Sequence, residues 1–206
     1  MAAGIVSSDH VQNGQADLRF DSGRACLDLL ATAHPVERID SPARLRAWLV
    51  GAGLIPEGAR LDRVDADCVV AFRELRADLD RLVRDAPEPP AAESPALDAA
   101  LARLNTFAAA APPAPRAVRA ADGGLVRVLH PDPAGPALLA AVARDAVELL
   151  TDPVARSRIR QCEGDNCPLI YLDTSRGRRR RWCSSEVCGN RERVARHRRR
   201  TALTRT

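Results

Sequence analysis

Six cysteines occur in the chain, and four of them are spaced as two pairs that suit a metal ion. Cys162 and Cys167 form the first pair, and Cys183 and Cys188 form the second pair after fifteen intervening residues. Four thiolates arranged as a tetrahedron are the ligand set of a structural zinc site. A closed set of four leaves no position for a substrate, so the sequence predicts one structural Zn²⁺ held by these four residues.

Disulfides are the alternative use of these four cysteines. The N-terminus, Met1 to Leu18, lacks the cationic start and apolar run of a secretory signal. No stretch approaches the roughly 18 consecutive apolar residues of a membrane-spanning helix. We therefore expect a cytoplasmic protein with no membrane partner, whose thiols stay reduced, and we favour zinc. The remaining Cys26 and Cys68 lie on apolar helical stripes and are expected to be buried core thiols.

The residues between and after the four cysteines predict a small treble-clef-like zinc finger, a β-hairpin followed by a C-terminal helix. The segments 169–172 and 179–182 are predicted to be its strands. Ser184 is the expected N-cap of a helix that runs through Arg200 and carries Cys188 in its first turns. The side chains expected to form a small core beside the metal are Tyr171, Trp182, Val187 and Val194. About 50 residues cannot fold on such a core alone, so the metal supplies much of the folding free energy.

The first 155 residues are predicted to form a helical domain with one small β-hairpin, which makes the whole chain mainly α. Apolar residues at helical spacing predict helices in the ranges 26–33, 42–52, 61–82, 95–107 and 138–150. The run Asp122-Gly123-Gly124, between two apolar segments, predicts the hairpin turn. Such a domain is large enough to bury its own core. We therefore divide the chain into residues 1–155 and residues 156–206.

Charge is distributed unevenly along the chain. All 31 basic residues are arginine, which excludes chemistries that need lysine, such as a P-loop or a Schiff base. Residues 156–206 hold 15 Arg against 5 acids, for a net charge of +10, whereas residues 1–155 have a net charge of −6. An acidic body with a strongly basic end is typical of a nucleic-acid-binding protein, and a solvated basic tail is the alternative.

The sequence nominates no catalytic site. His10, His34 and His130 are widely scattered, and the chain has no glycine-rich phosphate loop, no His-Glu-x-x-His and no Gly-x-Ser-x-Gly pattern. The acids of the helix expected at 61–82 alternate with arginines and are expected to form a solvated face. We therefore do not expect an enzyme.

The basic end contains the residues expected to contact nucleic acid. On a helical wheel, the face of the last helix opposite the metal carries Asn190, Arg193, Arg196, His197 and Arg200. A second cationic edge, suited to phosphates, consists of Arg178, Arg179, Arg180 and Arg181. Arg191 points to the core side and is expected to be structural, packed on Trp182, which is itself structural. Only Glu192 is acidic after Cys188, which weighs against a merely solvated face.

Four stretches of the sequence resemble known families. RIRQCEGDNC, YLDTSRGRRRRWCS and CGNRERVARHRRR resemble the CGNR zinc finger, which is named after the run Cys188-Gly189-Asn190-Arg191. GRACLDLLATAH resembles the ABATE domain, although Ala31 stands where that family often has Asn before Thr32. The resemblance implies a bacterial, stress-related transcription regulator with a mainly helical N-terminal domain.

Two functions are consistent with these features. The first is a DNA-binding transcriptional regulator whose arginine-rich helix contacts double-stranded DNA. The second is a zinc-stabilised adaptor whose arginines bind RNA or an acidic protein partner. In either case the N-terminal domain is larger than a finger needs as a scaffold. We expect this domain to bind a small-molecule effector or to form a homodimer, with an inert folding platform as the alternative.

Overall fold

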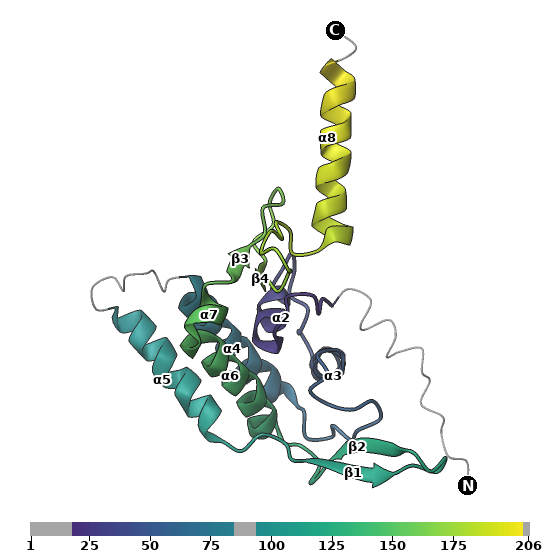
Figure 1. Cartoon of the computed structure of the whole chain (residues 1–206). Helices are drawn as coiled ribbons and strands as arrows, with labels where there is room; N and C mark the ends of the chain where they lie inside the picture. The colour runs from purple at the N-terminus through teal and green to yellow at the C-terminus, as the bar shows by residue number, and fades with distance from the viewer. Residues whose placement is uncertain (1–17, 85–93, 204–206) are drawn as a thin grey trace.

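Helix α4 (Ala66–Arg84) lies at the centre of a group of helices in the computed structural model, which describes residues 18–84 and 94–203. The helices that contact it are α2 (Ala25–Ala31), α3 (Pro42–Gly51), α5 (Pro95–Ala109) and α6 (Gly135–Thr151). Figure 1 shows α5 and α6 alongside one another, next to α4. The mainly helical body that the sequence predicts is confirmed.

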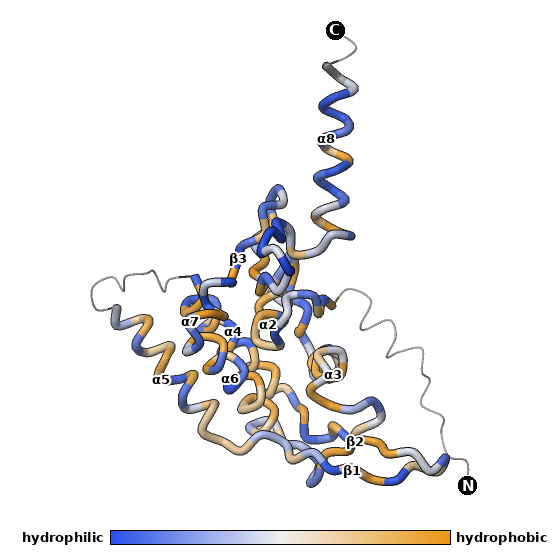
Figure 2. Tube along the Cα trace, in the orientation of Figure 1, coloured by the Kyte–Doolittle hydropathy of each residue, from blue (hydrophilic) through white to orange (hydrophobic). Residues whose placement is uncertain are grey.

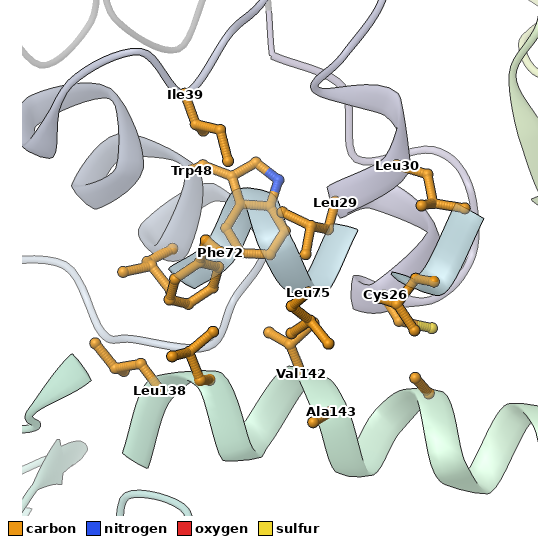
Figure 3. Packing of buried hydrophobic residues seen from close by; sticks show 14 of the residues in the cluster. Cys26, Leu29, Leu30, Ile39, Trp48, Phe72, Leu75, Leu138, Val142 and Ala143 are labelled. Carbon is orange, nitrogen blue, oxygen red and sulfur yellow. The ribbon is translucent and has the colours of Figure 1, made fainter. Parts of the chain in front are cut away.

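The core of the body forms where the apolar stripe of α4 meets its neighbours. Phe72 and Trp48, from α4 and α3, are fully buried, and their rings meet edge to face with centroids 5.9 Å apart. Figure 3 shows Leu138 and Val142 of α6 on the opposite side of this core. The apolar stripe that predicts a helix from residue 61 begins before α4, which starts at Ala66. Asp65 Oδ1 accepts a hydrogen bond from the Cys68 amide and so caps the N-terminus of α4.

Three helices of the body begin at a polar capping residue that is followed by proline. The Ser41 hydroxyl caps α3, and the Ser94 hydroxyl caps α5. Asp152 Oδ1 accepts an amide hydrogen bond of 2.8 Å and starts the short helix α7 (Pro153–Arg156). Each cap is followed by proline, whose missing N–H costs no helical hydrogen bond at this position. Local sequence signals therefore determine where these helices start.

A β-hairpin extends from the end of the body that lies farthest from the C-terminal helix (Figure 1). Its strands β1 (Pro115–Arg119) and β2 (Leu125–Leu129) are antiparallel, with Val118 opposite Val126. The turn holds Gly123 at a φ of 85°, a left-handed conformation that glycine adopts without strain. The hairpin predicted from the Asp-Gly-Gly run is confirmed.

A second hairpin precedes the C-terminal helix, and one of its strands differs from the prediction. β3 (Ile159–Gln161) pairs antiparallel with β4 (Ile170–Leu172). The expected strand at 179–182 is wrong, because this segment is an irregular loop. The first cysteine pair instead lies in the connection between β3 and β4, which the Cys162 amide closes by donating to the Leu169 carbonyl at 2.9 Å. This hydrogen bond continues the β3–β4 ladder and makes β3 the partner of β4.

The C-terminal helix stands away from the rest of the molecule (Figure 1). One turn of π-helix, η1 (Ser185–Gly189), leads into α8 (Asn190–Leu203), and the Ser184 hydroxyl caps η1 as predicted. Figure 2 shows α8 as mostly hydrophilic. The expected core positions of Val187 and Val194 are wrong, since these side chains are 45% and 46% exposed. They remain in solvent because α8 points outward rather than lying across the second hairpin.

The body and the second hairpin share their cores. Ile170 and Leu172 of β4 are buried in the apolar core of the body. In the opposite direction, Ala31 at the end of α2 packs with the buried cysteines. The chain is therefore mainly α, with two small hairpins and a cysteine cluster near its C-terminal helix, which is the predicted fold class.

Candidate metal centre and arginine-rich surface

The four cysteines predicted as zinc ligands come together beside η1. Cys162, Cys167, Cys183 and Cys188 place their sulfur atoms within 4.8 Å of one another. The Sγ of Cys183 lies 3.7 Å from that of Cys167 and 3.6 Å from that of Cys188. Zinc–sulfur bonds of about 2.3 Å in a tetrahedron separate the sulfurs by roughly 3.8 Å. The spacing of the sulfurs therefore fits one Zn²⁺.

Separate pieces of the chain deliver these ligands. Cys162 follows β3, Cys183 follows the irregular loop, and Cys188 lies in η1. The loop between β3 and β4 passes close to Cys188 at Gly164. A Cβ at this position would lie 3.1 Å from the Cβ of Cys188 and 3.4 Å from the Sγ of Cys162. The lack of a side chain at Gly164 therefore lets the two pairs approach one another.

The surroundings of the sulfurs suit thiolates bound to a cation. Burial opposes ionisation of Cys162, but the amides of Cys183 and Gly164 donate to its sulfur at 3.3 and 3.4 Å and bring its pKa below the ordinary value. Burial raises the pKa of Cys183 and of Cys188, the latter to about 11. Bound Zn²⁺ supplies the positive charge that keeps such thiols deprotonated. Four sulfur ligands leave no open position, so the metal has a structural role.

Tyr171 and Trp182 form a wall of the metal centre, as predicted. Tyr171 is buried and Trp182 is half-buried, and both pack with the cysteine cluster. The other apolar contacts come from Leu169 in the loop between β3 and β4 and from Ala31 on α2, rather than from α8. Sequence reasoning missed Ala31, because no spacing rule connects it to cysteines more than a hundred residues later.

The arginines expected to form a second cationic edge have different surroundings. Arg178 and Arg179 are exposed. Arg181 pairs with Glu163 through Nε and Oε2, 2.6 Å apart. Arg180 is half-buried, and its guanidinium donates to main-chain carbonyls of the interior. Arg180 therefore differs from its exposed neighbours in its hydrogen bonds to the main chain, because the segment is a loop and lacks the alternation of a strand.

The expected packing of Arg191 on Trp182 is replaced by another contact. Arg191 is exposed on α8. The guanidinium of Arg181 lies over the Trp182 ring instead, with Cζ 5.1 Å from the ring centroid. The tryptophan keeps its structural role, and the cation that covers it comes from the preceding residue.

The α8 residues predicted to contact nucleic acid all lie on the surface. The exposed residues of this set are Asn190, Arg193, Arg196, His197 and Arg200. Arg191 and Arg198 are exposed as well, so the exposed arginines extend beyond the one predicted face of the helix. The one acid of α8, Glu192, pairs with Arg199 at 3.2 Å. The helix therefore presents a cationic surface to solvent.

Two family models match the chain. The larger match covers residues 23–153 and is the ABATE model, described as "Putative stress-induced transcription regulator". The chain belongs to the ABATE family. In this ABATE protein a second model, the CGNR zinc finger, matches residues 158–201. No curated protein matches the chain.

The two matches confirm the resemblances found in the sequence. Together with the four-cysteine cluster, the CGNR match assigns one structural zinc ion to the ABATE protein. The matched families are a regulator family and a zinc finger, and neither is an enzyme family. Within the residues that the structure describes, every helix is too short or too polar to span a membrane.

Proposed function

We propose that this protein is a transcription regulator that binds double-stranded DNA through α8, and that zinc holds the base of this helix. The proposal rests on the exposure of α8, which carries six arginines and one acid. Most side chains of α8 are polar or charged, and such a helix gains little from packing against its own protein. Its arginines match the phosphates and the guanine edges of a duplex instead.

The dimensions of α8 suit the major groove. The helix has 14 residues and is about 21 Å long. The major groove of B-DNA is about 12 Å wide and admits one α-helix. Because exposed arginines lie on more than one face of α8, some can face the bases while others reach the phosphates on the groove walls.

The distribution of charge orients the complex. Residues 156–206 have a net charge of +10, and residues 1–155 have a net charge of −6. A duplex therefore attracts the C-terminal segment and repels the body. Since α8 points away from the body, this arrangement keeps the acidic surface at a distance from the phosphates (Figure 1).

Zinc connects α8 to the rest of the chain. Cys188 lies in η1, immediately before α8 begins at Asn190. With the metal bound, the start of the helix is tied to three other ligands. Removal of zinc should therefore weaken DNA binding, because the unanchored arginines must be ordered again when the complex forms.

The test is a binding titration of the full-length, zinc-loaded protein with a labelled DNA duplex over a series of salt concentrations. The variant replaces Arg193 and Arg196 with alanine. If both side chains contact phosphates, affinity falls and the slope of log K against log salt shrinks by about 1.8. A matched control replaces Arg116 and Arg119 of β1, which are exposed at the far end of the body, and should leave both quantities unchanged.

Other outcomes distinguish the alternatives. An RNA of equal length that binds more tightly than the duplex at matched salt would make RNA the partner. Binding by an acidic peptide but by neither nucleic acid would favour a protein adaptor. If the α8 variant and the β1 control bind the duplex as the wild type does, α8 is not the contact surface.

A further inference from the structure

The guanidinium of the half-buried Arg180 is held by main-chain carbonyls, whereas Arg178, Arg179 and Arg181 are exposed. Its Nε donates to the Trp182 carbonyl at 2.9 Å, and its Nη2 donates to the Asp21 carbonyl at 2.9 Å and to the Cys183 carbonyl. The guanidinium also lies over the Tyr171 ring, with Cζ 4.3 Å from the ring centroid. Three main-chain acceptors and one aromatic face therefore hold this cation.

The main chain of Arg180 is held as well. The Tyr171 hydroxyl donates to the Arg180 carbonyl at 2.5 Å, and the Arg180 amide donates to Oδ2 of the buried Asp173 at 3.2 Å. The other oxygen of Asp173 accepts from the amide and hydroxyl of Ser175, at 2.9 and 2.6 Å. These hydrogen bonds therefore fix the backbone of Arg180.

The acceptors of Arg180 belong to two parts of the molecule. Asp21 lies in the segment that leads into α2 of the body. Cys183 is a zinc ligand, and the following residue, Ser184, caps η1. One guanidinium therefore connects the body to the turn from which η1 and α8 begin.

We infer that Arg180 is a positioning residue for α8, because it fixes the turn at Cys183 and Ser184 against the segment that contains Asp21. Zinc holds the four cysteines together, whereas the hydrogen bonds of Arg180 hold the cysteine cluster against the body. A lysine cannot take over this role, since it has one ammonium group in place of a planar fork that can stack on a ring. The consequence for DNA binding rests on the proposed function of α8.

This positioning should lower the cost of binding DNA. A helix held in one direction loses little freedom when it enters the groove, whereas a loosely held helix must be ordered during binding. The loss of Arg180 should therefore weaken the complex although no phosphate contact is lost. Affinity falls, and its dependence on salt stays the same.

Hydrogen exchange of the full-length, zinc-loaded protein tests the positioning directly. The Leu172 amide donates to the Ser22 carbonyl at 2.8 Å, and the Gly189 amide donates to the Ser184 carbonyl at 2.9 Å, so the two amides report on the body contact and on the start of η1. In Arg180→Ala and Arg180→Lys, both amides should exchange about tenfold faster while zinc content stays unchanged. Arg179→Ala, an exposed neighbour with the same loss of charge, should leave both rates unchanged.

The same variants are then titrated with the DNA duplex over a salt series. Both Arg180 variants should bind about tenfold more weakly than the wild type, with an unchanged salt slope. A smaller salt slope for Arg180→Ala together with unchanged exchange would make Arg180 a phosphate contact and overturn the inference. Wild-type exchange and affinity in Arg180→Lys would also overturn it, since charge alone would then suffice.

Two further results remain interpretable. If Arg180→Ala loses zinc or unfolds, Tyr171→Phe decides the matter, because it removes the hydroxyl bond to the Arg180 carbonyl but keeps the ring. Faster exchange of both amides in Tyr171→Phe supports the positioning role, and unchanged exchange contradicts it. If the wild type binds no duplex, the proposed function fails, while the exchange measurements still decide whether Arg180 positions α8.

Discussion

The amide of Leu172 donates a hydrogen bond to the carbonyl of Ser22, and the two atoms are 2.8 Å apart. Leu172 ends β4 of the metal-binding segment, and Ser22 precedes α2 of the body. The Leu172 side chain is buried in the core of the body beside Ile170. The metal centre is therefore joined to the body through both main chain and side chains, and the two should unfold together.

Replacement of Cys183 with serine should release zinc and destabilise the body. Loss of the metal frees β4 from its centre, so Ile170 and Leu172 leave the core, at a cost of about 3 kcal/mol or more. Metal analysis should give about one zinc per chain for the wild type and none for the variant. Denaturant unfolding, followed by helical circular dichroism, should show the lower stability.

A matched control for this experiment is Cys68→Ala. Cys68 is also a buried thiol, but it lies on α4 and outside the cysteine cluster. This variant should keep its zinc. A Cys183→Ser protein that loses zinc while its body unfolds at the wild-type denaturant concentration would show that the two parts are independent.

Gly51 should not tolerate alanine. A Cβ at Gly51 would lie 2.2 Å from Cζ of the Phe20 ring, so the ring would have to move, at a cost of about 1–3 kcal/mol. Gly53 provides the contrast, since it has open space around its Cβ position and a φ of 69°. Asparagine accepts this left-handed conformation, so Gly53→Asn should be nearly neutral, whereas Gly51→Asn should be destabilised. Equal denaturation midpoints for the two asparagine variants would contradict the steric explanation.

Asp28 should make the protein less stable as pH rises from about 4 to about 6. Burial raises the pKa of this carboxyl from 3.8 to about 6, although the Ser22 amide donates to it. The native state therefore binds more protons than the unfolded state in this window, and stability falls by up to about 3 kcal/mol. Asp28→Asn should remove this slope, and Asp132→Asn, at an exposed position, should retain it. Unfolding free energies measured from pH 4 to 7 test the prediction.

Glu37 should make the protein less stable as pH falls below about 4.5. Its carboxylate accepts two hydrogen bonds from Arg76, at 2.9 and 2.5 Å, and these bonds lower its pKa from 4.5 to about 2. The stability that they provide is complete above the ordinary pKa and is lost as pH falls toward 2. Glu37→Gln should lower stability at neutral pH by about 1–3 kcal/mol and flatten the acid limb of the stability curve. An acid limb identical to that of the wild type would exclude Glu37 as its source.

Local signals in the sequence account for the elements that were predicted. Ser41 and Asp152 cap helices because a short polar side chain followed by proline favours a helix start wherever it occurs. The Cys162, Cys167, Cys183 and Cys188 set is equally local, since two spaced pairs are enough to form one zinc site. The pairing of β3 and β4 was not predicted, because strands of three residues leave almost no periodic pattern.

Burial of charged residues depends on partners that the sequence pattern does not reveal. Asp78 was expected on a solvated face of α4 but is 2% exposed. Its carboxylate accepts hydrogen bonds from Arg103 of α5, at 2.8 and 2.5 Å, which compensates the charge. The hydrogen bond of Arg180 to the Asp21 carbonyl is equally hidden in the sequence, since Asp21 lies far from Arg180 in the chain. Both contacts can be predicted only with knowledge of which segments meet in the folded protein.

Ala31 and Leu172 lie on opposite sides of the junction at residues 154–157, yet each packs into the core of the other segment. A recombination event at this junction would separate side chains that are buried only together. In a chimera that carries the finger without this body, Ile170 and Leu172 would be exposed to solvent, and exposed aliphatic side chains promote aggregation. Selection against such products favours inheritance of the two segments as a unit, and a working chimera should keep residues 18–31 with the finger.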